Sequence, residues 1–383
     1  MEVALTSPHH GHRTAVIALL AALALASGIV IPLVHAQSVV AIVPVNRNPI
    51  GLAYDSAEGE VFVANYFQNT VTIISDATNE VVASVSVGSE PGGVVYDSAR
   101  DEVFVSNSNS STVSIISDAT DAVVATVPVG DGPADMAYDS AKGEVFVANS
   151  FGSTVSVISD ATNAVVAAVA VGDGPFGVAF DSVRNEVFVT NYSSNTTSVI
   201  SASTDAVVTT VRVGGGPTGA AYDPEKGEVF VDDSNDNSTS VISDLKNAVV
   251  ATVPVGFSPI GLAYDSGTGE IFVANYYGTT VSVISDSRNA VVASVSVGYS
   301  PAGVAYDAAR GEVFVADSGS NAVSVISDAT DASGTSTEPS PAQASSSSSI
   351  SSLYVGIVLI NVVLFLTLGG LVEAKERGYR RRP

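Results

Sequence analysis

The side chains of this sequence that could do chemistry are mostly carboxylates and amides, and they recur at a constant step of 42 residues. An Asp at the end of a short apolar run accepts hydrogen bonds from turn backbone, and a Glu at a strand start is solvated. We therefore interpret both recurring sets as structural. The sets are Asp55, Asp97, Asp139, Asp181, Asp223, Asp265 and Asp307, and Glu60, Glu102, Glu144, Glu186, Glu228, Glu270 and Glu312.

A denser group of oxygen ligands lies in segment 232–238, where Asp232, Asp233 and Asp236 are weak calcium candidates. The segment lacks the Asp-x-Asp-x-Asp-Gly order with a distal Glu, so a polar loop is the simpler interpretation. We predict no cofactor.

Catalysis by other side chains is narrowly bounded. There is no Cys, and all four His lie within the first 35 residues. The rest of the chain therefore has no Ser-His-Asp triad, thiolate nucleophile or His-ligated metal. We predict a protein that is not an enzyme, with a calcium-dependent, lactonase-like hydrolase as the catalytic alternative. The net charge of −24 argues against nucleic acid as a partner, because that binding needs a basic surface.

The 42-residue step predicts the fold. Within one unit, segments 51–55, 60–65, 70–75 and 80–87 read as four strands joined by short turns and loops. The second and third strands are apolar on both faces, which a small sheet tolerates only when other sheets cover it. Seven such units predict a β-propeller or a stacked β-solenoid.

The phase of the repeat separates these two architectures. Segment 39–45 matches a fourth strand but stands before the first unit, whereas 333–339 lacks the strand that the seventh unit needs. A ring resolves both anomalies if 39–45 pairs with 323–327, whereas a solenoid needs caps instead. We predict an all-β, closed seven-bladed propeller of four-stranded antiparallel blades over residues 37–332.

The repeat also resembles a known family. Phe-Val-Ala-Asn-Tyr at 62–66 and Thr-Val-Ser-Val-Ile-Ser at 154–159 resemble the YVTN-type β-propeller repeat, as does Val-Gly-Asp-Gly-Pro-Phe-Gly-Val-Ala at 171–179. The resemblance covers 39–332 and implies a surface-layer-associated, archaeal or bacterial cell-surface protein. It names no single ligand. The chain departs from the motif by using Phe-Val-Ala-Asn in place of Tyr-Val-Thr-Asn.

The two ends predict a membrane-anchored protein. Residues 1–36 read as a cleaved signal peptide, with an uncleaved anchor as the alternative. Residues 333–352 are a Ser/Thr/Pro-rich stalk, and 353–372 contain no charge over a length that spans a bilayer. The basic tail 373–383 predicts a cytoplasmic C-terminus and an extracellular propeller on a single-pass protein.

Comparison between repeats suggests where a partner binds. The first-to-second and third-to-fourth turns barely vary, whereas the other two loop sets differ from repeat to repeat. Those two sets emerge on one face and carry aromatics, which are enriched in binding patches. Loop drift is the simpler alternative. The predicted binding sector comprises Tyr66, Phe67, Phe257, Tyr276, Tyr277 and Tyr299.

Four Asn-x-Ser/Thr sequons add candidate glycosylation sites at Asn109, Asn191, Asn195 and Asn237. We predict a cell-surface recognition or adhesion module whose partner is an extracellular protein or envelope glycan. A structural component of the surface layer or envelope is the alternative.

Overall fold

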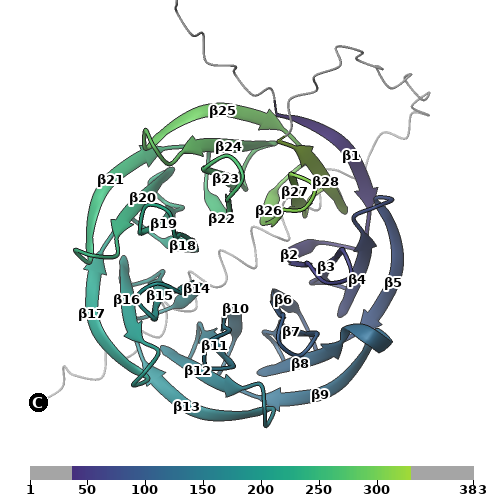
Figure 1. Ribbon diagram of the computed structural model, residues 1–383, viewed down its shortest axis with the longest axis horizontal. Coiled ribbons are helices and arrows are strands. Elements are labelled where there is room, and N and C mark those ends of the chain that lie inside the picture. Colours follow the sequence, from purple (N-terminus) through teal and green to yellow (C-terminus); the bar gives the residue numbers. More distant parts are fainter. Residues whose placement is uncertain (1–36, 329–383) are drawn as a thin grey trace, which may run out of the picture. The chain divides into compact units, whose positions relative to one another are not determined.

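The computed structural model describes residues 37–328, which fold as seven four-stranded antiparallel sheets arranged around a central axis (Figure 1). Each sheet is one blade, and in six of the seven blades the strands follow one another in sequence from the centre outward. The predicted seven-bladed propeller is confirmed. One short 3-10 helix, η1 (Asp118–Thr120), lies in the third-to-fourth turn of blade 2.

The strands agree closely with the segments expected from the repeat. The first, innermost strands are β2 (Pro49–Asp55), β6 (Pro91–Asp97), β10 (Pro133–Asp139), β14 (Pro175–Asp181), β18 (Pro217–Asp223), β22 (Pro259–Asp265) and β26 (Pro301–Asp307). The second are β3 (Glu60–Asn65), β7 (Glu102–Asn107), β11 (Glu144–Asn149), β15 (Glu186–Asn191), β19 (Glu228–Asp233), β23 (Glu270–Asn275) and β27 (Glu312–Asp317). The third are β4 (Thr70–Ser75), β8 (Thr112–Ser117), β12 (Thr154–Ser159), β16 (Thr196–Ser201), β20 (Ser238–Ser243), β24 (Thr280–Ser285) and β28 (Ala322–Ser327).

The fourth strands form the rim, and one of them closes the ring. They are β5 (Glu80–Ser86), β9 (Ala122–Pro128), β13 (Ala164–Ala170), β17 (Ala206–Arg212), β21 (Ala248–Pro254), β25 (Ala290–Ser296) and, in blade 7, β1 (Ser38–Pro44). Strand β1 pairs antiparallel with β28, with Val43 opposite Val323. The predicted pairing of the two ends of the repeat array is therefore confirmed.

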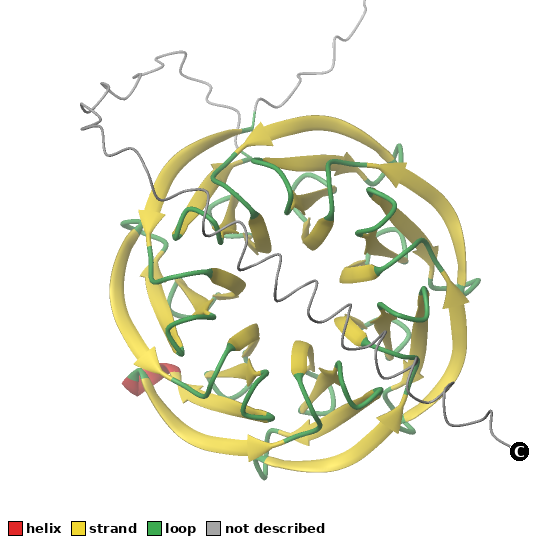
Figure 2. Ribbon diagram, turned by 180° about the vertical axis from the view of Figure 1, so that it is seen from behind, coloured by secondary structure: helices red, strands yellow, loops and turns green. Residues whose placement is uncertain are grey.

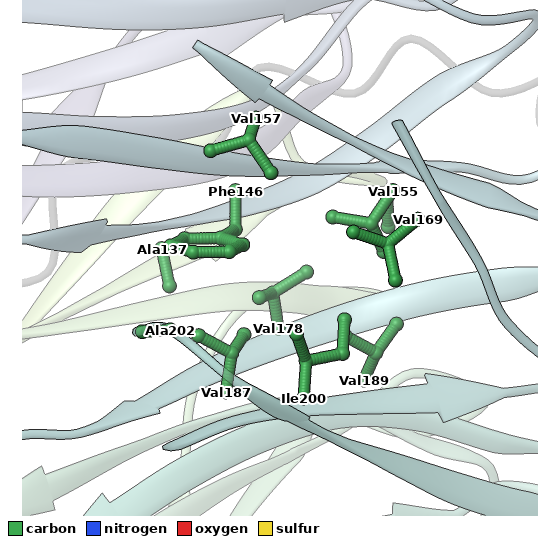
Figure 3. Packing of buried hydrophobic residues seen from close by; sticks show 11 residues of the cluster. Ala137, Phe146, Val155, Val157, Val169, Val178, Val187, Val189, Ile200 and Ala202 are labelled. Atoms are coloured by element: carbon green, nitrogen blue, oxygen red, sulfur yellow. The ribbon is translucent and has the colours of Figure 1, made fainter. Parts of the chain in front are cut away.

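The hydrophobic core lies between neighbouring blades. Figure 3 shows one such layer, in which Phe146 and Val157 of blade 3 face Val187 and Ile200 of blade 4. The motif Phe supplies a fully buried ring in every blade. Both faces of the second and third strands are buried because each blade is covered on two sides.

Around the central axis the first strands approach one another closely. A Cβ on Gly261 would overlap the carbonyl oxygen of Ala302 in the next blade, and the same holds for Gly51 against Gly92. Glycine is therefore required at this repeat position in most blades.

The rim departs from simple alternation. In β5, Ile73 lies opposite Ala83 and Ile74 opposite Val81, so Val82 is the extra residue of a β-bulge. Val81 and Val82 are both exposed as a result. Such bulges occur in all seven fourth strands and disturb the pairing edge that an outermost strand offers to other chains.

The predicted signal peptide 1–36, stalk 333–352, transmembrane segment 353–372 and cytoplasmic tail 373–383 all lie outside the described residues. Within 37–328 no helix has the length and apolar character needed to cross a membrane.

The close approach of the first strands yields a stability prediction. Gly261→Ala should lower the free energy of unfolding by about 1–3 kcal/mol, because blades 6 and 7 must move apart to admit the methyl group. Gly92→Ala is the matched control, since its Cβ meets the nearest atom, Ser106 Oγ, at 3.6 Å. Urea unfolding of both variants measures the effect, and equal stabilities would contradict this account.

Candidate functional site

The propeller has two faces of different character. The individual face consists of the blade-to-blade loops and the second-to-third loops, such as 46–48 and 66–69. The uniform face consists of the first-to-second and third-to-fourth turns, such as 55–60 and 75–80. Figure 2 shows these connections as the green segments between the strands of each blade.

The predicted aromatic sector lies on the individual face, and most of its rings are accessible. Phe257 is 70% exposed, Tyr299 69%, Tyr277 56% and Phe67 42%. Tyr276 is half-buried beneath Tyr277, with ring centroids 5.4 Å apart. Four rings therefore present area to solvent.

Backbone hydrogen bonds hold the blade 6 aromatics together. The N–H of Tyr277 donates to the carbonyl of Phe257 at 3.2 Å, and that of Ser300 donates to Gly278 at 3.1 Å. Phe257, Tyr276, Tyr277 and Tyr299 therefore come from adjoining, mutually bonded loops.

The remaining pair stands on blade 1. The rings of Tyr66 and Phe67 meet edge to face, with centroids 5.3 Å apart, and Tyr66 Oη donates to Glu90 Oε2 at 2.7 Å. Burial, followed by Glu90, raises the pKa of the Tyr66 phenol, which stays a neutral donor. The blade 7 loop between the two groups consists of small polar residues, Ser318 to Asn321.

Aromatic exposure on the individual face extends beyond the predicted sector. Phe151 is 60% exposed on blade 3, and Phe176 is 38% exposed at the start of blade 4. The large apolar residues exposed in the turns of the uniform face are Val183 and Leu245. Exposed aromatics among residues 37–328 are thus confined to the individual face.

The four sequons differ in accessibility. Asn109 and Asn195 are exposed, and Asn237 is partly buried. Asn191 is fully buried, and its amide donates to Thr196 Oγ1 and Ser198 Oγ at 3.1 and 3.0 Å. Burial removes Asn191 from the acceptors that the folded propeller presents.

The weak calcium candidates do not converge. Asp232 accepts from Thr239 Oγ1 at 2.9 Å, whereas Asp233 accepts from Ser240 Oγ at 2.6 Å on the opposite face of the sheet. Asp236 accepts from the backbone N–H of Gly215. Burial raises the pKa of Asp232 well above its usual range and that of Asp233 to about 6. Within 37–328, no group of three acidic, His or Cys side chains is arranged to hold a metal ion.

Asp135 occupies a position that is Gly in the other six repeats. Its Oδ2 accepts from the N–H of Val178 at 3.2 Å, which links blade 3 to blade 4. Desolvation raises the pKa of Asp135 to about 6. The geometry assigns it a contact between blades rather than a catalytic arrangement.

The uniform face is strongly acidic. Its turns carry 26 acidic residues against seven basic ones within residues 37–328. The recurring Asp is fully buried and caps its turn, as Asp55 Oδ1 does by accepting from the N–H of Ala57 at 2.7 Å. The structural interpretation of this Asp is confirmed, while its Oδ2 has no hydrogen-bond partner in six of the seven blades.

A circle of aromatic side chains that was not predicted from the sequence lies beside these carboxylates. The residue before each recurring Asp is Tyr in six blades and Phe180 in blade 4. Tyr138 Oη donates to Asp160 Oδ2 at 3.2 Å, and burial followed by Asp97 of the preceding blade raises the Tyr138 pKa. The repeat marker contained this Tyr, but a strand position alone does not reveal which side chains it meets.

Carboxyl groups also meet across blade junctions. Burial, followed by Asp55 of blade 1, raises the pKa of Asp118 in blade 2 to about 7. Burial, followed by Asp265, likewise raises the pKa of Asp328 to about 6. The blade 3–4 junction has Ala202 in the corresponding place, and there Lys142 Nζ binds Glu144 at 2.8 Å and Asp205 at 3.2 Å.

Comparison with known proteins agrees with this architecture. The model of the YNCE-like beta-propeller family matches residues 129–341, more than half of the chain. The chain belongs to the YNCE-like beta-propeller family. No curated protein sequence matches it significantly. Among solved structures, it is similar to a chain of Kuenenia stuttgartiensis hydrazine synthase, with 18% identity and a TM-score of 0.67. That alignment covers 74% of this chain and 96% of the other, and at this identity it shows the fold alone.

The junction carboxyls predict that the protein is more stable in mild acid. Raised pKa values mean that the folded state binds protons between about pH 4 and pH 7 that the unfolded state releases. Stability should therefore fall as pH rises through this window, lowering Tm by several degrees between pH 5 and pH 8. Asp118→Asn should flatten this dependence. A Tm that rises from pH 5 to pH 8 would contradict the assignment.

Glycosylation at the two exposed sequons can be tested with substitutions that already occur elsewhere in the repeat. Ser111→Asn destroys the sequon at Asn109, and blade 1 already has Asn at the equivalent position, Asn69. Thr197→Val destroys the sequon at Asn195, and blade 1 already has Val at the equivalent position, Val71. Each change should remove one glycan from the native protein in intact mass spectra. A wild-type mass equal to the sequence mass would refute glycosylation at both sites.

Proposed function

We propose that this protein is a non-catalytic recognition or adhesion module of the cell surface, anchored by segment 353–372 with the propeller outside the cell. The YVTN-type resemblance and the two apolar ends of the sequence support this location. The proposed partner is an extracellular protein or an envelope glycan.

One observation carries the proposal: the exposed aromatics among residues 37–328 gather on the individual face. Large, rigid aromatic side chains contribute much of the energy at interfaces and lose little entropy on binding. The bonded loops around Phe257, Tyr277 and Tyr299 hold these rings in a fixed relation, so little ordering is needed when a partner binds.

No observation specifically supports either alternative function, the lactonase-like hydrolase or the structural envelope component. A lactonase-like mechanism would need convergent acidic ligands, and Asp232, Asp233 and Asp236 point to different surroundings. A role as a structural envelope component would need lateral contacts between copies, and the bulged fourth strands oppose strand pairing at the rim.

A binding experiment tests the aromatic sector. The triple variant Phe257→Ser, Tyr277→Ser and Tyr299→Ser should reduce cosedimentation of the propeller, residues 37–328, with native cell envelopes by at least tenfold. The proposed anchor 353–372 is left out because it would bind membranes by itself. The expected loss reflects about 1–2 kcal/mol or more from the truncated aromatic contacts. Pretreating envelopes with protease or with periodate separates a protein partner from a glycan.

The matched control replaces the exposed apolar residues of the other face. Val183→Ser with Leu245→Ser removes comparable exposed apolar groups without touching the sector. It should bind as the wild type does, and both variants should retain the wild-type Tm because the changed side chains are exposed. Undiminished binding by the triple variant would defeat the proposal.

A further inference from the structure

A second candidate site lies at the central axis, on the opposite side from the aromatic sector. The halves of the first strands nearest the uniform face line a wide-open cavity of about 530 Å³ in blades 2 to 5. These strands, β6, β10, β14 and β18, lie side by side at the centre of the ring (Figure 1). This cavity uses none of the residues assigned to partner binding.

Aromatic side chains from four successive blades line the cavity. They are Tyr96, Tyr138, Phe180 and Tyr222. Most of the remaining lining is apolar, including Met136 and Ala220. Each of these rings also packs against the core layer of its own blade junction. Their accessible parts offer aromatic surface to an organic cation, because the negative faces of aromatic rings attract positive charge.

Carboxylates behind the rings make the cavity electronegative. Each of the four lining strands ends in a fully buried Asp directly after its aromatic residue: Asp97, Asp139, Asp181 and Asp223. The Oδ2 atoms of all four are buried without a partner at hydrogen-bonding geometry. Phenols of the following blades nevertheless face three of the carboxylates, those of Asp97, Asp181 and Asp223. None of the described residues that line the cavity is basic. The buried negative charge is therefore available to stabilise a cation held among the rings.

The phenols beside these carboxylates remain neutral. Burial raises the pKa of Tyr96, Tyr138 and Tyr222, and neighbouring aspartates raise each of them further. The rings therefore stay uncharged aromatic surfaces.

Two departures from the repeat coincide with the cavity. Phe180 replaces the Tyr of the other six blades, so Asp139 of the preceding blade lacks a facing phenol. Ala220 stands where blades 1 and 6 have Leu52 and Leu262, which leaves more room in blade 5. Both residues lie within the lining. The position of Ala220 is variable, with Val in blades 2, 4 and 7 and Met in blade 3, and Ala is the smallest residue found there.

We propose that this cavity binds an organic ammonium ion, specifically a quaternary ammonium group. Methyl groups around the nitrogen match the apolar and aromatic lining, and the positive charge matches the buried carboxylates. An unmethylated inorganic cation would lose its water without gaining direct ligands, because no three acidic groups are arranged to coordinate one within residues 37–328.

Calorimetric titration of the full-length protein tests the charge preference directly. Choline is compared with 3,3-dimethylbutan-1-ol, which has the same shape but carries carbon in place of the charged nitrogen. We expect choline to bind at least tenfold more tightly, which corresponds to about 1.4 kcal/mol. Equal affinity for the two compounds, or no heat from choline at millimolar concentration, would overturn the proposal.

The repeat provides a matched pair of variants. Tyr138→Leu removes a ring from the lining, whereas Tyr306→Leu removes the equivalent ring from blade 7, which does not line the cavity. Choline affinity should fall at least fivefold in Tyr138→Leu and change by less than twofold in Tyr306→Leu. Similar losses in both would show a general effect on the fold and refute the site.

Two further variants keep the test decisive if Tyr138→Leu fails to fold. Phe180→Leu exchanges one apolar residue for another, and Ala220→Leu installs the residue that blades 1 and 6 already carry. The first removes a ring and the second fills the cavity, so each should weaken choline binding at least fivefold while Tm stays within a few degrees. Wild-type affinity in both would refute the proposal.

Discussion

Every blade of this propeller is a sheet with two apolar faces, and neither face can be left in water. A single four-stranded sheet of this composition would expose its second and third strands, including the motif Phe, to solvent. Only a neighbour on each side removes that cost, and this row of blades provides one at both ends by closing rather than by adding caps. The ring, the interblade layers and the close approach of the first strands all follow from this requirement.

The same requirement decides which parts of the structure could be predicted from the sequence. Strand positions and ring closure depend on burial, which repeats every 42 residues, so the boundaries agree to within two residues and the pairing of 39–45 with the last repeat was correct. The bulge at Val82 was not predicted. Val81 and Val82 are the same residue type, so the apolar–polar alternation of the strand does not show which of them is the extra residue. The membrane segments stay predictions, because they lie outside 37–328.

The candidate sites were predicted less completely. Exposed loop aromatics such as Phe257 can be identified by comparing repeats, since nothing in the blade requires them. Burial of Asn191 could not be deduced from its sequon, because its role as a buried donor depends on Thr196 and Ser198 of the next strand. The Tyr before each recurring Asp was not predicted to line a site, because a residue present in nearly every repeat looks structural. Only the folded propeller brings copies from successive blades around one cavity.

The pairing of β1 with β28 has a consequence for how the protein is made. Val43 and Val323 are partners although 280 positions separate them along the chain. The first strand to leave the ribosome must therefore wait, unpaired, until the last blade has been synthesised. Loop closure over that length is entropically costly and slow, so ring closure is expected to be a late step of folding. Until then, blade 7 lacks its outer strand and the edge of β28 remains open to other chains.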